Sequence, residues 1–226
     1  FDDPSALETS LRGADVLYNT YWVRFNHRLF TFDQAVANTR TLFEAARRAG
    51  VRRIVHVSIL HADEADDLGY YRGKHALEDA LRATGIPHGI VRPGVLFGRG
   101  DILINNIAWT LRKLRFAGVF GDGEYALRPL HVDDMADLIL EHAFERNGDP
   151  SAVRSDTSAA DAVGPERFTY RELLATLSEI LDLRRRLVCV PPRIGWLVSK
   201  LINPFVGDVV ITWEEVLGMM RNLLDS

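Results

Sequence analysis

Short apolar stretches alternate with longer stretches of helical period along the first 95 residues. The short stretches carry β-branched side chains between polar flanks, which is typical of buried strands. Strands separated by helices pair in parallel, because each connection crosses back over the sheet. The pattern therefore predicts an α/β fold with a doubly wound parallel sheet. Three strands are expected at 16–18, 54–59 and 88–91, and two helices at 32–49 and 71–83.

The rest of the chain becomes mostly helical. Thr169 followed by Glu172 has the spacing of a helix capping box. Residues 149–167 are rich in Pro, Ser, Asp and Gly, and we expect a linker there. We therefore expect a first domain over 1–148 and a small C-terminal α/β lobe, mostly helical, over 149–226. Further helices are expected at 3–12, 101–115, 133–145, 169–182 and 213–224, and a strand at 187–190.

Composition narrows the classes of function. Hydrophobic residues make up 47% and charged residues 26% of the chain, as in ordinary globular proteins. The net charge of -4 argues against a nucleic-acid partner. A single cysteine, Cys189, and histidines without a shared ligand spacing predict no metal site. We find neither an apolar run long enough to span a bilayer nor a signal-peptide pattern, and we expect a cytoplasmic protein.

Polar residues stand where the predicted strands end, at the edge where parallel sheets bind ligands. Tyr70 and Lys74 are four residues apart at a helix start, so one turn places them on the same face. An ammonium lowers the pKa of a neighbouring phenol and can hold ribose hydroxyls, which leaves the phenol to exchange a proton with a substrate. An exposed helix start with an incidental Tyr and Lys is the alternative. The residues at this edge are Asn19-Thr20, Ser58, Tyr70 with Lys74, and Pro93-Gly94.

Five segments together resemble the extended and atypical short-chain dehydrogenases/reductases. Their order and spacing are most similar to the NAD-dependent epimerase/dehydratase-like proteins. That group is related to NmrA-like proteins and to the accessory nucleotide-binding subunit of respiratory complex I. The segments are NTRTLFEAA at 38–46, GVRRIVHVS at 50–58, YYRGK at 70–74, VRPGVLFG at 91–98 and HVDDMA at 131–136.

The resemblance implies a Rossmann-type domain that binds NAD or NADP. It also implies a first strand and a glycine-rich phosphate loop ahead of Phe1, so we expect the sheet to lack its first βαβ unit. Gly94, Gly98 and Gly100 do not have the spacing of that loop.

The resemblance also assigns roles to individual residues. Tyr70 and Lys74 would be the acid/base and ribose-binding pair, and Ser58 would share the substrate oxygen with Tyr70. Asn38 would support the lysine through water. The remaining cofactor contacts would come from Asn19, Thr20 and Tyr21 on the ribose side, and from Pro93, Gly94 and Val95 on the nicotinamide side.

The expected function is therefore NAD(P)-dependent oxidoreductase or epimerase/dehydratase chemistry on a hydroxyl or carbonyl group of a small molecule. The alternative is a catalytically inactive nucleotide-binding accessory or sensor protein that docks to a membrane complex or another partner. The Tyr70/Lys74 pair favours the enzyme, whereas the short interval from Ser58 to Tyr70 favours the accessory protein. Two stretches, 107–116 and 194–202, mix aromatic, apolar and basic residues, as interfacial helices do. Core packing is the other interpretation of these stretches, so peripheral membrane contact stays open.

Overall fold

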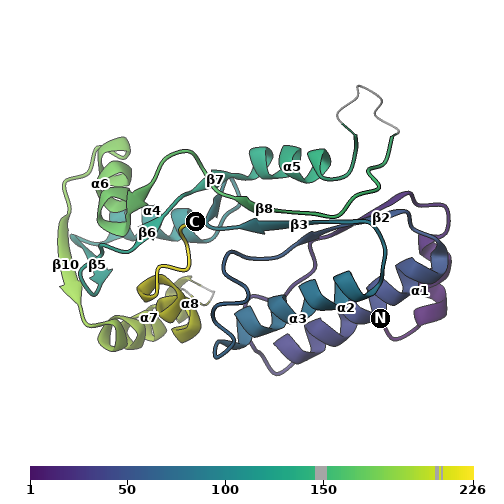
Figure 1. Cartoon of the computed structure of the whole chain (residues 1–226). Helices are drawn as coiled ribbons and strands as arrows, with labels where there is room; N and C mark the ends of the chain where they lie inside the picture. Colours follow the sequence, from purple (N-terminus) through teal and green to yellow (C-terminus); the bar gives the residue numbers. More distant parts are fainter. Residues whose placement is uncertain (146–151, 207–208, 210) are drawn as a thin grey trace. The chain divides into compact units, whose positions relative to one another are not determined.

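The computed structural model describes residues 1–145, 152–206, 209 and 211–226 (Figure 1). They form two compact units, each built from two stretches of chain. The domain boundary expected at 148/149 lies outside the described residues. That the part before this boundary binds the cofactor and the part after it contacts the substrate stays a prediction. The first unit contains Phe1–Pro93 and Asp133–Ala162, and the second contains Gly94–Val132 and Val163–Ser226.

A four-stranded parallel sheet forms the centre of the first unit, in the order β1-β2-β3-β8. The predicted α/β class with a parallel sheet is confirmed. α1, α2 and α3 lie on one face of the sheet and α5 on the other (Figure 1). The strands are β1 Val16–Asn19, β2 Arg53–Val57, β3 His88–Pro93 and β8 Ser158–Ala162. The helices are α1 Pro4–Leu11, α2 Phe32–Ala49, α3 Gly69–Ala83 and α5 Val132–Glu141.

The helix ends of this unit follow from local chemistry. Asp3 accepts hydrogen bonds from the N–H groups of Ser5 and Ala6 at the start of α1. Thr31 caps α2 by accepting from Gln34 N at 3.1 Å. Gly50, with φ +79°, ends α2 in the left-handed conformation that glycine adopts without steric cost.

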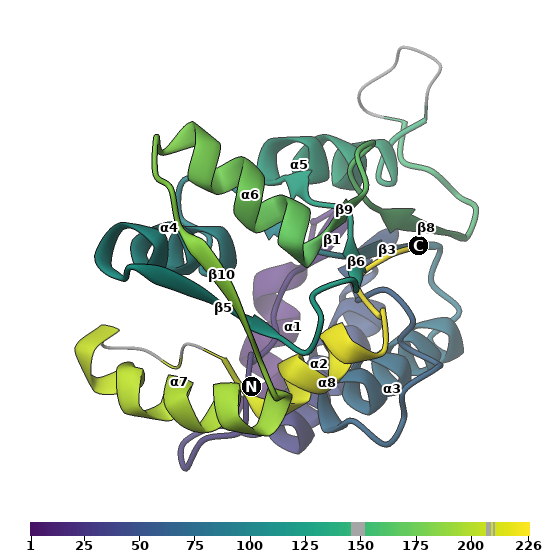
Figure 2. The same ribbon diagram turned by 90° about the vertical axis from the view of Figure 1, so that its left-hand side faces the viewer.

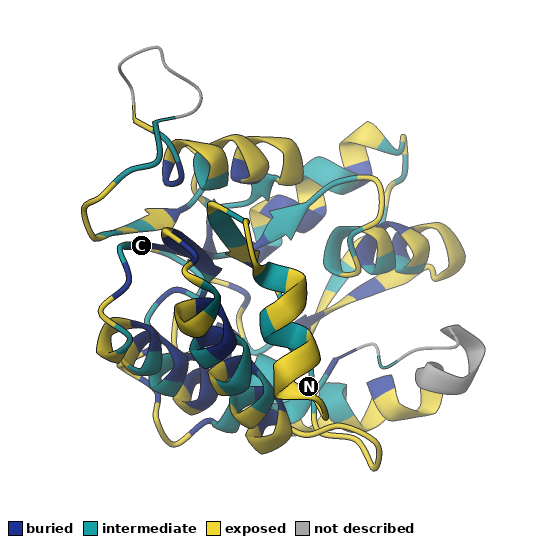
Figure 3. Ribbon diagram, turned by 90° about the vertical axis from the view of Figure 1, so that its right-hand side faces the viewer, coloured by how far each residue is buried: buried dark blue, intermediate teal, exposed yellow. Residues whose placement is uncertain are grey.

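The sheet is covered on both faces, and β2 and β3 are buried along nearly their whole length (Figure 3). α2 and α3 bury one side each and expose the other, as their helical period predicts. This core fixes the ends of the strands relative to α3, which carries two of the predicted site residues. Its fully buried members include Phe43, Ile54, Leu77, Leu81 and Ile90.

The interpretation of 149–167 as a linker is wrong over Ser158–Ala162, because these residues form β8. They pair in parallel with β3, from Gly89 opposite Ser158 to Pro93 opposite Ala162. The segment has small and polar side chains and no β-branched residue, so it carries no strand pattern of its own. Pairing with β3 decides its conformation, as tertiary context often does for strands.

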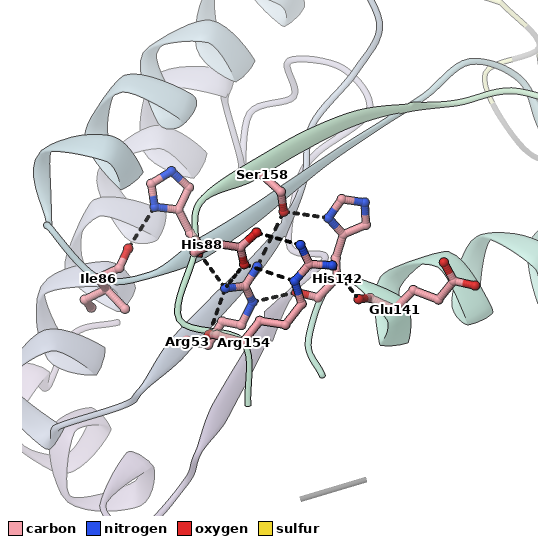
Figure 4. Close-up of polar contacts among 8 residues, drawn as sticks. Arg53, Ile86, His88, Glu141, His142, Arg154 and Ser158 are labelled. Atoms are coloured by element: carbon pink, nitrogen blue, oxygen red, sulfur yellow. Dashed lines mark hydrogen bonds and ion pairs between the residues drawn. The ribbon is translucent and has the colours of Figure 1, made fainter. Parts of the chain in front are cut away.

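The side chain of Arg53 is fully buried. It connects the start of β2 to the residues that precede β8 and to the residue after α5 (Figure 4). Its Nε donates to His142 O at 2.5 Å, and its Nη1 donates to Arg154 O at 2.9 Å and Asp156 O at 2.7 Å. Ser158 accepts a hydrogen bond at its Oγ from Arg53 Nη2 at 3.4 Å and lies 2.9 Å from His142 Nδ1. These contacts lie at the amino ends of the strands and have a structural role.

The second unit is built around a parallel two-stranded ribbon, β5 with β10. α6 and α7 lie on opposite sides of this ribbon (Figures 1 and 2). β10 was expected from the sequence and β5 was not. The elements are β4 Leu96–Phe97, α4 Leu103–Lys113, β5 Phe116–Phe120, β6 Ala126–Leu127, β7 Leu130–His131, β9 Phe168–Thr169, α6 Tyr170–Ile180, β10 Arg186–Val190, α7 Pro192–Val206 and α8 Trp213–Met220.

The expected capping box at the start of α6 is present. Thr169 Oγ1 accepts from Glu172 N at 3.2 Å, and Glu172 Oε2 accepts from Thr169 N at 2.7 Å. Thr212 and Glu215 form the same pair at the start of α8. Among the helices in the described part of the chain, none is long and apolar enough to cross a lipid bilayer.

Candidate functional site

The predicted site residues of the first unit lie where its parallel strands end. β1 ends at Asn19 and β3 at Pro93, while Ser58 directly follows β2. Since these strands are parallel, their carboxyl ends share one edge of the sheet. α3 begins eleven residues after Ser58 and carries Tyr70 and Lys74 one turn apart.

Asn19 is buried and joins the ends of β1 and β2. Its Nδ2 donates to His56 Nδ1 at 2.9 Å, and its Oδ1 accepts from Tyr21 N at 3.2 Å. Desolvation, followed by the positive charge of Lys74, lowers the pKa of the fully buried His56 to about 3. The imidazole is therefore neutral at physiological pH, as accepting a hydrogen bond at Nδ1 requires. The Asn19 side chain shapes the turn towards Tyr21.

Lys74 is a buried lysine, only 3% exposed. Its Nζ donates to the carbonyl oxygen of Val57, the last residue of β2, at 2.8 Å. The same Nζ lies 4.8 Å from the ring centroid of Trp22. Burial lowers the pKa of Lys74 to about 7, and the carboxylate of Glu78 opposes this effect. The amine of Lys74 thus gains and loses its proton near neutral pH.

Three aromatic residues, Trp22, Phe32 and Tyr70, form what we call the aromatic cover. Trp22 stacks on Phe32 with ring centroids 5.8 Å apart and meets Tyr70 edge-on at 5.6 Å. A side chain at Gly73 would place its Cβ 2.6 Å from Cη2 of Trp22. Glycine at this position of α3 therefore lets the indole lie between the phenol and the ammonium.

Glu78 of α3 and Arg92 of β3 form an ion pair between this helix and the sheet. Glu78 is 1% exposed and accepts from Arg92 Nε at 2.8 Å, Arg92 Nη2 at 2.6 Å and Arg82 Nη2 at 2.8 Å. These guanidinium groups keep the pKa of Glu78 below its usual value in spite of burial. Ser58, also buried, adds to that lowering, although its Oγ makes no hydrogen bond of regular geometry within the described residues. The Ser58 hydroxyl therefore lies close to the Glu78 carboxylate, directly after the end of β2.

Asn38 was expected to support Lys74, but its side chain hydrogen-bonds to Tyr21 and Gln34. Its Nδ2 donates to the Tyr21 hydroxyl at 2.9 Å, and its Oδ1 accepts from Gln34 Nε2 at 2.8 Å. Asn38 therefore orients Tyr21, while the adjacent Thr20 is exposed. A role of Asn38 towards Lys74 through water stays a prediction.

The predicted nicotinamide-side residues divide between the two units. Pro93 ends β3, and its carbonyl oxygen accepts from Leu60 N at 3.3 Å. Gly94 and Val95 begin the second unit, where the Val95 side chain belongs to the hydrophobic core. Val95 O accepts from Leu130 N at 2.9 Å. Cofactor contacts from these residues stay predictions.

Sequence reasoning did not single out Phe32, Glu78 or Arg92 for this site. Two signals were available. Glu78 continues the four-residue spacing of Tyr70 and Lys74 along α3, and Arg92 is a charged residue directly after the apolar residues of a predicted strand. A buried strand tolerates such a charge only with a partner, so a carboxylate on the covering helix is expected.

Comparison with known proteins shows which proteins the chain is similar to. Residues 1–104 match a family model described as NAD(P)H-binding. The chain is 24% identical over 212 residues to the mitochondrial NADH-ubiquinone oxidoreductase 40 kDa subunit of Neurospora crassa, covering 93% of this chain and 54% of that protein. It is 28% identical over 186 residues to (4-alkanoyl-5-oxo-2,5-dihydrofuran-3-yl)methyl phosphate reductase of Streptomyces griseus, covering 80% of this chain and 57% of that protein. The chain thus spans little more than half the length of these relatives.

A solved structure shows the same fold. The Citrobacter sp. triphenylmethane reductase, crystallised with NADP(H), superposes with a TM-score of 0.75 at 17% identity, covering all of this chain and 73% of that one. The Rossmann-type fold and the resemblance expected from the sequence segments are both confirmed.

Proposed function

We propose, on the premise that residues 1–104 match a family model described as NAD(P)H-binding, that this protein is an NAD(P)-dependent oxidoreductase or epimerase. Its substrate would be a small molecule with a hydroxyl or carbonyl group. One observation carries the proposal. Tyr70 and Lys74 lie one turn apart on α3, and Lys74 is held at the carboxyl end of β2 by Val57 O at 2.8 Å.

The residues at this edge fit a nicotinamide nucleotide. Lys74 has three N–H donors and uses one on Val57 O, which leaves donors for ribose hydroxyls. Ser58 Oγ is buried without a regular hydrogen bond in the described part of the chain and can bond to a substrate oxygen. The cofactor, when bound, supplies the hydride chemistry. Tyr70 exchanges the proton of the substrate hydroxyl, and the charge of Lys74 favours the phenolate that this exchange needs.

Access to Lys74 requires a change at the aromatic cover. The indole of Trp22 lies over the ammonium, with Nζ 4.8 Å from the ring centroid. A ribose therefore reaches Lys74 only after this ring turns aside. Trp22 fluorescence should consequently change when the nucleotide binds.

The test combines cofactor binding with turnover in the longest natural chain that contains residues 1–226. NADH and NADPH are titrated by calorimetry, and carbonyl reduction is followed with a panel of small ketones and aldehydes. Tyr70→Phe should keep the cofactor affinity and lose turnover by about 10²-fold or more. Tyr71→Phe, on the neighbouring residue, is the matched control and should leave turnover unchanged. Absence of cofactor binding, or full turnover in Tyr70→Phe, would refute the proposal.

A second candidate function is favoured by α7 in the second unit. Gly195 of α7 packs on Phe120 and Val190 of the ribbon. Another side of the helix exposes a row of apolar residues spaced by three and four positions. Its residues are Ile194, Leu197, Val198 and Leu201, exposed by 53%, 55%, 47% and 72%. Apolar residues in such a row are typical of a contact surface. The accessory alternative, docking without turnover, therefore has a physical basis.

Our candidate partner for α7 is an anionic lipid surface, because the second unit also carries basic residues. The ends of α4 and α6 lead into the paired strands β5 and β10, so two basic segments meet at the start of the ribbon. No carboxylate pairs with their side chains within the described residues, and Arg185 bonds to Leu111 O at 2.7 Å. Basic and apolar residues together favour the interface of an anionic bilayer. The cations are Arg112, Lys113, Arg115, Arg184, Arg185 and Arg186.

Flotation with vesicles tests this candidate. The protein should bind vesicles of mixed phosphatidylcholine and phosphatidylglycerol, and binding should weaken with salt. Leu197→Glu combined with Leu201→Glu should abolish it. Leu29→Glu, at a residue of the first unit that is 85% exposed, is the control and should bind normally. Equal binding by all three proteins, or none by the parent, would exclude a lipid surface.

A further inference from the structure

Three residues of α3 are spaced by four, Tyr70, Lys74 and Glu78, so they follow one another along the same side of the helix. Lys74 and Glu78 are 3% and 1% exposed, respectively. A buried carboxylate is costly to keep charged unless its surroundings compensate it. Glu78 is compensated by its paired guanidinium groups, and it therefore carries a fixed negative charge one turn from the lysine.

Arg92 makes this charge immobile. It approaches from β3 and holds both carboxylate oxygens of Glu78, at 2.8 Å from Nε to Oε1 and 2.6 Å from Nη2 to Oε2. Two parallel hydrogen bonds of this kind fix the orientation as well as the position of a carboxylate. Arg82 adds a third, at 2.8 Å to Oε2. The contact ties α3 to the sheet, and this structural role is the simplest alternative explanation for Glu78.

The groups around Lys74 differ in their effect on its charge. On β2, His56 is neutral and Val57 offers only a carbonyl oxygen. The indole of Trp22 covers the ammonium and keeps water from it. On α3, the carboxylate of Glu78 opposes the effect of burial on the pKa of Lys74.

We propose that Glu78 is a positioning residue for the Tyr70–Lys74 pair. Its carboxylate, held by Arg92, is the counter-charge that favours the ammonium form of Lys74 while the aromatic cover excludes water. The inference rests on the proposed function, in which Lys74 favours the phenolate of Tyr70. It adds that Lys74 depends on Glu78 for this role. Without this negative charge, burial under Trp22 leaves a neutral amine, which does not favour the Tyr70 phenolate.

The composition of the chain allows a direct test. It contains three lysines, Lys74, Lys113 and Lys200, and the last two are exposed. With Lys113→Arg and Lys200→Arg, Lys74 is the only lysine left in residues 1–226, and its Nζ can be titrated by NMR after labelling with [15N]lysine. Glu78→Gln should lower the pKa of Lys74 by about one unit or more. Glu78→Asp, which keeps the charge, should stay closer to the parent. An unchanged pKa in Glu78→Gln would overturn the proposal and leave the tie between α3 and β3 as the role of Glu78.

Loss of Glu78 alone leaves Arg92 partly buried and less well paired, so Glu78→Gln can fail to fold. The double variant Glu78→Gln/Arg92→Gln removes both charges and keeps amides in their place. Because Arg92 carries the opposite charge, its removal offsets part of the change, so the pKa of Lys74 in the double variant should lie below that of the parent and above that of Glu78→Gln. A parental pKa in a folded double variant would equally overturn the inference.

Turnover separates this inference from the proposed function. If Tyr70→Phe loses turnover, Glu78→Gln should move the pH profile of kcat/KM in step with the pKa of Lys74. A profile that stays in place despite the pKa change would overturn the positioning role. Unchanged turnover in Tyr70→Phe would instead refute the proposed function, on which this inference rests.

Discussion

The ring of Trp22 lies directly against the backbone of α3 at Gly73, where an added Cβ would come within 2.6 Å of Cη2. The indole of Trp22 thus contacts both Tyr70 and Lys74, and it can do so only because residue 73 between them is a glycine. This relationship couples a loop residue after β1 to the helix that carries the candidate acid/base pair.

Gly73→Ala should destabilise the protein, although alanine normally stabilises a helix interior by about 1 kcal/mol relative to glycine. The clash with Trp22 should reverse that gain to a loss of about 1–3 kcal/mol. Urea unfolding of a double-mutant cycle with Trp22→Phe measures the coupling. Because phenylalanine is smaller than the indole, Gly73→Ala should cost much less in that background. Equal cost in both backgrounds would contradict the contact.

Protein stability should fall as the pH decreases from about 6.5 towards 3, because of His56. The pKa of His56 is lowered from 6.5 to about 3 in the folded protein. Between these values the unfolded chain binds a proton that the folded protein does not, so acid favours unfolding. The slope from one such group is at most about 1.4 kcal/mol per pH unit.

Chemical denaturation at several pH values tests this slope. His56→Gln, whose amide oxygen can still accept from Asn19, should show a smaller pH dependence than the parent. His142, whose pKa is also lowered by burial, adds an effect of the same sign, so part of the slope should remain. An identical slope in parent and variant would rule out His56 as a source of acid sensitivity.

Arg53→Met should be severely destabilising. The substitution keeps much of the side-chain volume but removes the donors that Arg53 gives to the carbonyl oxygens of His142, Arg154 and Asp156. Unsatisfied buried carbonyl groups cost about 1–3 kcal/mol each, so we expect a loss of about 3 kcal/mol or more. Arg53→Lys keeps the charge with fewer donors and should lie between parent and Arg53→Met in thermal unfolding. A loss below about 1 kcal/mol in Arg53→Met would show that water replaces these donors.

Thr169→Ala should destabilise the start of α6 by about 1 kcal/mol through loss of the capping box. Hydrogen exchange should report faster opening of the first turn of α6, around Glu172, while exchange in α2 stays as in the parent. Thr169→Ser retains the hydroxyl and is the control. If Thr169→Ser is as harmful as Thr169→Ala, the hydroxyl is not the stabilising group.

Elements with a strong period could be predicted from the sequence, whereas β8 could not. α2 and α3 show their apolar faces directly, and β2 is a β-branched run. β8 consists of Ser, Ala and Asp residues that are held by pairing with β3. Gly89 on β3 helps to explain the local packing, since a Cβ there would lie 2.9 Å from Cβ of His142. Such complementarity between distant segments leaves no periodic signal.

Tyr70 and Lys74, on α3, could be predicted from the sequence. The contribution of Trp22, in the loop after β1, could not. Four-residue spacing places Tyr70 and Lys74 on one side of α3 whatever the tertiary structure is. The burial of Lys74 depends on Trp22, which lies in an irregular segment without a period. The electrostatics follow from that burial, so the poised amine of Lys74 could not be inferred from sequence.

The chain passes between the two units three times, after Pro93, after Val132 and after Ala162. A gene product shortened to end before Ser158 would lack β8 and leave the edge of β3 unpaired. A product that starts beyond Pro93 would lose β1, β2 and β3 together. Neither unit can therefore be obtained, exchanged by recombination or removed by a single cut without damage to the other. The two units therefore have to be synthesised and inherited as one piece.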